Sequence, residues 1–121
     1  MDDFEYALDF YEPMLAMSAF STLCGKYGEP VSHDRHRMIF ESKYVVVKFA
    51  RNPEGLRLNL HEHGRHGVPV PKSRFISVQG VPCLMMQKVK MAMDLTDLPE
   101  WARLVLNVGY TRANKLVAFD L

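Results

Sequence analysis

Apolar residues recur at helical spacing near the N-terminus of this chain. Between residues 4 and 24 they lie mostly three or four positions apart, at Phe4, Leu8, Tyr11, Met17, Phe20, Leu23 and Cys24. Pro13 should divide this stretch into two helices or begin the second one, and Gly25 should end it as a C-cap. We therefore expect a helical segment over residues 1–25, packed on a single compact domain formed by residues 26–121.

Shorter runs that contain β-branched, aromatic or other apolar residues follow in the rest of the chain, separated by turn residues. The strands that these runs predict cover residues 29–33, 37–41, 44–49, 74–78, 81–87, 108–111 and 115–120. Turns at 79–80 and 113–114 would join the last four into two hairpins. The expected fold class is α+β: a curled, mostly antiparallel sheet of about five strands packed on one helix, with the helical segment before it and a hairpin after it.

The helix expected to cover this sheet follows the 44–49 strand. Asn52 suits an N-cap with Pro53 at the first helical position, and Gly64 is a natural stop. A second, short helix should begin near Leu98 and run to about residue 106.

The face that this helix turns toward the sheet decides whether Glu62 can reach the sheet. At 100° per residue Leu56 and Leu60 turn inward, and Glu62 lies on the flank of the face they define. From there Glu62 can contact Lys48 on the preceding strand. The alternatives are a solvent-facing Glu62 and a Lys48 that extends to water from the strand edge.

Composition and charge narrow the class of protein. No apolar run approaches the roughly 20 residues that span a bilayer, and the acidic start is unlike a secretory signal, so we expect a cytoplasmic protein. Cys24 and Cys83 form no CxxC motif, which favours buried free thiols over a disulfide or metal pair. Residues 33–74 contain nine basic side chains against four acidic ones and all five histidines, whereas residues 1–32 contain one against six.

The order of elements resembles the N-lobe of the protein-kinase family from about residue 27 onward. Residues 45–48 resemble the kinase strand whose lysine, here Lys48, contacts nucleotide phosphates. Glu62 is similar in place to the helix glutamate that orients this lysine. Asn107 and Asp120 resemble the catalytic-segment asparagine and the metal-binding aspartate. From the residues alone, the alternatives are a helix stop or turn residue for Asn107 and a surface carboxylate for Asp120.

Two further segments extend the resemblance. The hairpin of 74–78 and 81–86 resembles the next two kinase strands, which lead into a hinge near residues 87–89. The Tyr-Gly-Glu-Pro of residues 27–30 and the Val-Ala-Phe-Asp of residues 117–120 resemble the small, truncated kinase-like proteins that tailed bacteriophages encode. That origin would place the protein in the host cytoplasm.

Departures from the kinase pattern argue against catalysis. Residues 31–37 contain no glycine where kinases close a glycine-rich turn over phosphates. Between Val89 and Asn107 there is no His-Arg-Asp, and Asp94 and Asp97 lack the expected neighbours. The sequence ends one residue after Asp120, so we expect no activation segment. The resemblance therefore implies a pseudokinase-like protein rather than an enzyme.

Three functions follow, in order of preference. The first is a non-catalytic, cofactor-free module that binds and inhibits or modulates a host protein, with docking candidates Arg35, His36, Arg37, Arg65, His66 and Lys72. The alternative is a vestigial phosphotransferase that holds Mg-ATP with Lys48, Glu62 and Asp120. The third is a nucleic-acid binder using the basic 33–74 block, although no interleaved aromatic residues accompany its charge.

Metal binding and self-association complete the expectations. His61 and His66 are five apart with Gly64 between them, which does not fit the zinc-binding spacing of four on one helical face, so we expect no metal site. Sheet edges left by a missing second lobe need a cover. The N-terminal helices, a protein partner or a second copy of the chain could supply it, which leaves a homodimer open.

Overall fold

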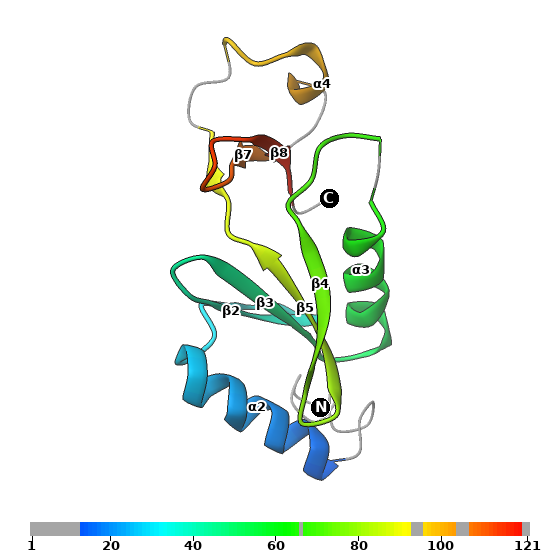
Figure 1. Cartoon of the computed structure of the whole chain (residues 1–121). Helices are drawn as coiled ribbons and strands as arrows, with labels where there is room; N and C mark the ends of the chain where they lie inside the picture. Colours follow the sequence, from blue (N-terminus) through cyan, green and yellow to red (C-terminus); the bar gives the residue numbers. More distant parts are fainter. Residues whose placement is uncertain (1–12, 66, 93–95, 104–106, 120–121) are drawn as a thin grey trace.

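The computed structural model describes residues 13–65, 67–92, 96–103 and 107–119. The fold is α+β, as predicted, and the sheet pairings are antiparallel (Figure 1). The described elements are α2 (Pro13–Tyr27), β1 (Ser32–His33), β2 (Arg37–Glu41), β3 (Val45–Ala50), α3 (Pro53–His63), β4 (Ser73–Val78), β5 (Val81–Gln87), β6 (Lys90–Met91), α4 (Glu100–Arg103), β7 (Val108–Tyr110) and β8 (Leu116–Ala118).

The main sheet has five strands in the order β1-β2-β3-β5-β4 and is open, with β1 and β4 at its edges. The predicted curl is wrong. Curvature of that kind is introduced by bulges or glycine kinks. The β2–β3, β3–β5 and β4–β5 ladders instead pair residue for residue without interruption. The edge strand β1 has only two residues, so it is too short to bring the β1 edge of the sheet round toward the β4 edge.

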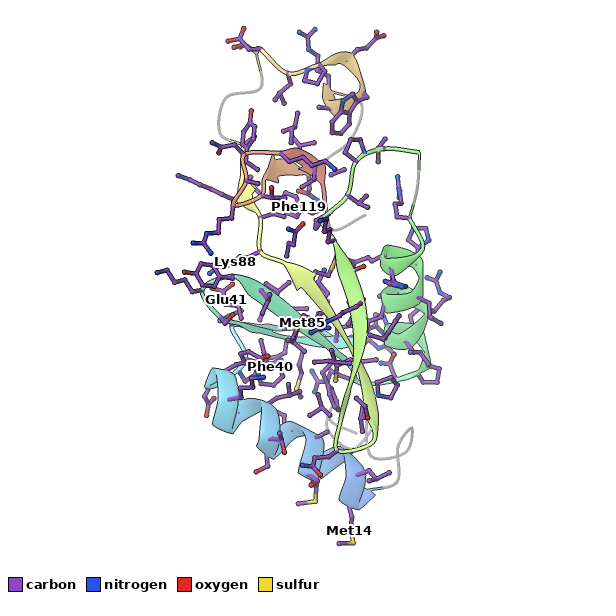
Figure 2. The ribbon with its side chains drawn as sticks, viewed as in Figure 1. Met14, Phe40, Glu41, Met85, Lys88 and Phe119 are labelled. Carbon is purple, nitrogen blue, oxygen red and sulfur yellow. The ribbon has the colours of Figure 1, made fainter. Side chains whose placement is uncertain are left out.

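The two faces of this sheet carry different helices. Phe40, Val47 and Phe49 point to the face covered by α2, where they form a core with Ala19 and Leu23. Figure 2 shows Phe40 between the sheet and α2. Their strand neighbours point to the opposite face, where α3 packs against β3 and β5 (Figure 1). The sheet therefore packs on two helices rather than one.

The end of α2 differs from its prediction. Gly25 is not the C-cap, because the helix continues to Tyr27. Gly28 follows with φ +82°, a left-handed conformation that glycine adopts without steric cost, and its N–H donates to the Cys24 carbonyl at 2.8 Å. Gly25 lies inside the helix with no atom within 4 Å of where a Cβ would lie. Residues 1–12 of the predicted segment lie outside the described residues.

The predicted hairpins are present at both positions. Gln79 and Gly80 have φ values of 50° and 84°, the signature of the type I′ turn that joins β4 to β5. Asn114 has φ 61° in the turn between β7 and β8. β6 was not predicted: it pairs with β7 to form a second sheet, in the order β6-β7-β8. Asp120, the end of the predicted last strand, lies outside the described residues.

The second sheet and α4 form a small core at the end of the molecule away from α2 (Figure 1). Leu98, Ala102, Val108 and Ala118 are buried together there. The N–H of Ala118 donates to the carbonyl of Pro69 at 2.8 Å, which attaches β8 to the loop after α3. Within the described ranges, no helix is both long and apolar enough to cross a membrane.

Both cysteines are free thiols, and burial should make one of them unreactive. Cys83 is fully buried, and this burial raises its pKa to about 12. At pH 8 roughly one thiol in 10,000 would then be the reactive thiolate. We expect iodoacetamide to modify Cys83 only after unfolding, as followed by mass spectrometry. Half-buried Cys24 is the internal comparison, and equal labelling rates at the two positions in the native protein would contradict the prediction.

Candidate functional site

Lys48 and Glu62 form a buried ion pair. β3 points Lys48 toward α3, and its Nζ lies 2.7 Å from Glu62 Oε2. The two residues are 5% and 7% exposed, so the solvent-facing alternatives for both are wrong. The contact that the kinase resemblance implies between these two side chains is therefore present.

The buried side of α3 is polar. Gly55, Asn59 and Glu62 are its buried residues, at the i, i+4 and i+7 positions of one helical face. The prediction that Leu60 turns inward is wrong, because Leu60 is 55% exposed. The rotation of α3 about its axis brings Glu62 against the cationic side chains of the sheet. The spacing of apolar residues along the helix could not have predicted this ion pairing.

A second cation completes the cluster. Arg37, on β2, donates through Nη1 to Glu62 Oε1 and to Asn59 Oδ1, the latter at 3.2 Å. Asn59 Nδ2 donates in turn to the Lys48 carbonyl at 3.0 Å. Two cations thus share one carboxylate, and Asn59 links α3 to the backbone of β3. We call Arg37, Lys48, Asn59 and Glu62 the ion cluster.

The start of α3 is attached to the turn before β2. Asn52 is the N-cap, as predicted: its Oδ1 accepts from the Gly55 N–H at 2.8 Å. Its Nδ2 donates to the carbonyl of Arg35 at 2.9 Å, and His36 Nδ1 lies 3.3 Å from its Oδ1. One buried amide therefore joins the start of α3 to the turn before β2, at the edge of the ion cluster.

Asp34 stabilises the same turn. Burial acts to raise the pKa of its carboxyl group, but N–H donors of Arg37 and His36 outweigh it and lower the pKa. A lowered folded-state pKa stabilises the fold above the ordinary value of 3.8. That contribution is lost as the pH falls through the folded-state pKa, so it is absent only in acid.

A cavity of about 280 Å³ adjoins the ion cluster. Lys48 lies in its wall, and Ile39, Val46 and Met86 line it from the same face of the sheet. Phe119, just after β8, closes another side. Six of the eleven residues that line the cavity are apolar, and its volume of about 280 Å³ lies just below the range of about 300–1,000 Å³ that is usual for small-molecule sites.

The segment between the two sheets forms the remaining wall. The N–H groups of Gln87 and Lys88 donate to the carbonyls of Lys72 and Tyr44, at 3.0 and 2.9 Å. Lys88 Nζ lies 3.1 Å from Glu41 Oε1, and Figure 2 shows the two side chains side by side. The wall is therefore held by β-sheet neighbours on both sides, and its rim carries both signs of charge.

The other predicted nucleotide-site residues are placed only in part. Asn107 is half-buried, and its carbonyl accepts from the Phe119 N–H at 3.0 Å, which brings it near the cavity wall. Asp120 lies outside the described residues. Among the residues that the structure describes, no three histidine, cysteine or carboxylate side chains gather as a metal site.

The docking candidates do not share one environment. Arg35 and Lys72 are exposed, and Arg65 is half-buried. Arg37 belongs to the ion cluster, with its side chain only 13% exposed. His36 is half-buried beside Asn52, and His66 lies outside the described residues.

Comparison of the chain with protein-family models, with curated proteins and with solved structures gives no match in any of the three. The kinase resemblance therefore stays a prediction drawn from the sequence.

Proposed function

We propose that this protein is a non-catalytic binding domain whose cavity holds a small ligand with a flat apolar ring and an anionic group, such as a nucleotide. The proposal rests on the position of Lys48 in the cavity wall. Its ammonium group is held by Glu62 in the wall of the 280 Å³ cavity. A lysine oriented in this way presents a fixed positive charge to an anion without needing to reorganise.

The rest of the cavity supports the same class of ligand. Ile39, Val46, Met86 and Phe119 offer apolar contact to a ring system, while Lys48 lies at the side near α3. The cavity opens beside Lys88 and Glu41 at the other rim. A ligand with one apolar and one anionic end would place the first against these apolar side chains and the second beside Lys48.

Binding without phosphoryl transfer is the part of the proposal that the sequence supports. Transfer needs a carboxylate that orients the attacking hydroxyl, and phosphate closure needs a glycine-rich turn. Residues 31–37 contain no glycine, and no His-Arg-Asp precedes Asn107.

Docking to a host protein has less support than ligand binding. Of its six candidate residues, Arg37 is engaged in the ion cluster and His36 contacts Asn52. Arg35 and Lys72 are exposed, so these two candidates remain accessible to a protein partner. A protein partner bound through them would not depend on Lys48.

Thermal unfolding with and without Mg-ATP tests the proposal. At 100 times the dissociation constant, a ligand that binds only the folded state adds about 2.7 kcal/mol of stability, a rise of roughly 10 °C for a chain of this size. We expect such a rise in the wild type and its loss in Lys48→Met, which leaves the Arg37–Glu62 pair in place.

Lys72→Met is the matched control, because it removes an exposed lysine that does not line the cavity. It should retain the full shift. Absence of any shift at 10 mM Mg-ATP, or an equal shift in Lys48→Met, would overturn the nucleotide proposal. Repeating the scan without magnesium separates binding through Lys48 from binding that needs a metal ion.

A further inference from the structure

A second, larger groove adjoins the Lys48 cavity and shares Lys88 and Val89 with it. It has a volume of about 480 Å³ and lies between the β2–β3 turn and the β7–β8 turn (Figure 1, left). Its charged and aromatic lining residues are Lys43, Tyr44, Lys88, Lys90, Tyr110 and Arg112. Four of these six are cations, and none of the described residues that line it is acidic.

Two tyrosines are exposed within this basic groove. Tyr44 is 46% exposed and Tyr110 38% exposed. The guanidinium carbon of Arg112 lies 4.2 Å from the centroid of the Tyr44 ring, and Lys43 Nζ lies 5.4 Å from it. These are cation–π distances, so the cations are held beside the aromatic ring rather than extended into solvent.

We propose that this groove binds single-stranded nucleic acid. Proteins that bind single strands combine a positively charged groove along the backbone with aromatic side chains on which bases stack. Here the Tyr110 ring and the Arg112 guanidinium, which lies over the Tyr44 ring, supply flat surfaces for stacking, and Lys43, Lys90 and Arg112 supply the charge. A duplex hides its base faces, so the exposed rings favour a single strand over a double helix.

The site differs from the basic block that the sequence pointed to. Only Lys43 and Tyr44 belong to residues 33–74, and the other members come from residues 88–90 and 110–112. The β2–β3 turn and the second sheet bring them together. Of the two aromatic residues in the groove, Tyr44 belongs to the block, and folding adds Tyr110 from outside it.

Fluorescence anisotropy with a labelled oligothymidine of about 12 nucleotides tests the proposal. Neutralising three or four phosphates should give a slope of about −2 to −3 in log association constant against log salt. Tyr44→Leu and Tyr110→Leu should each weaken binding about 10-fold through loss of stacking, and the corresponding phenylalanine variants should bind like the wild type.

Charge variants separate the groove from general attraction. Arg112→Ala should reduce the size of the salt slope by about 0.7, the value for one phosphate contact on a single strand. Lys26→Ala is the matched control, because Lys26 lies 5.4 Å from the Tyr27 ring in a similar pairing on α2. It should leave both affinity and slope nearly unchanged. Circular dichroism confirms that each variant is folded.

Three results would overturn the proposal. They are no binding at 50 mM salt, equal binding by the leucine variants, and equally tight binding of a duplex or a polyglutamate peptide. The test is independent of the Lys48 cavity: Lys48→Met should bind the oligonucleotide like the wild type whether or not it binds Mg-ATP. Lys88 borders both cavities and is therefore left unchanged.

Discussion

Replacement of Glu62 by glutamine is expected to lower the free energy of unfolding by about 3–5 kcal/mol. The substitution keeps the size of the side chain and removes its charge. Arg37 and Lys48 would then remain close together in a buried site without the carboxylate that they share. Since small domains are stable by about 5–15 kcal/mol, such a loss takes a large part of the total.

The two cations should be less sensitive than the carboxylate. Lys48→Met leaves Glu62 paired with Arg37, and Arg37→Met leaves it paired with Lys48. Each of these variants keeps one neutral ion pair, whereas Glu62→Gln leaves two like charges. We therefore expect both methionine variants to be more stable than Glu62→Gln. That order is the specific signature of a shared carboxylate.

Urea unfolding followed by circular dichroism measures these differences. Glu54→Gln is the matched control: Glu54 lies on the same helix and pairs with Arg57, but both side chains are exposed. Exposed ion pairs contribute little because water screens them, so this variant should unfold close to the wild type. Equal losses in Glu62→Gln and Glu54→Gln would show that the ion cluster does not stabilise the fold.

Most elements of this fold, though not β6, follow from local signals in the sequence. Asn52 and Pro53 mark the start of α3 correctly, and Gln79-Gly80 marks a turn whose positive φ values few other residue pairs adopt. A strand such as β3 can be found from its own β-branched and aromatic residues, three valines and Phe49. These signals act over a few residues, so one sequence is enough to detect them.

The orientation of α3 could not be predicted in the same way. Apolar spacing favours Leu56 and Leu60 as the inward side, but the buried face contains Gly55, Asn59 and Glu62. Helix rotation is set here by partners on β2 and β3, more than ten residues away in sequence. Arg37 was predicted to dock a partner for the same reason: its charge is visible in the sequence, and its burial is not.

The two proposed sites depend on the same architectural feature, the connection between the two sheets. Lys88 borders the Lys48 cavity on one side and the basic groove on the other. β6, which the sequence did not predict, holds Lys90 beside Tyr110 through its pairing with β7. A change that displaces the second sheet should therefore affect both sites, whereas single changes at Lys48 or Tyr44 should affect one.

Gly55→Ala is the second change with a large expected effect. A Cβ at this position would lie 2.1 Å from the His36 carbonyl oxygen and 3.2 Å from the Ala50 Cα. Both are backbone atoms, so relief requires α3 to move away from the sheet. Alanine favours helix by about 1 kcal/mol over glycine. Overpacking costs about 1–3 kcal/mol, and a clash with a backbone atom lies at the upper end of that range. After the propensity gain, we expect a net loss of roughly 2 kcal/mol in the free energy of unfolding.

Gly25→Ala is expected to raise the free energy of unfolding, the opposite of Gly55→Ala. Gly25 lies inside α2, and an added Cβ meets no atom within 4 Å, so this variant should gain about 0.5–1 kcal/mol from helix propensity alone. Urea unfolding of the two variants measures the contrast. A stabilised Gly55→Ala would mean that α3 does not press on the turn at His36. Gly55 and Glu62 lie on the same buried face of α3, so a shift of the helix away from the sheet would also move Glu62 relative to Lys48. Gly55→Ala should therefore weaken any ligand that binds through Lys48, whereas Gly25→Ala should not.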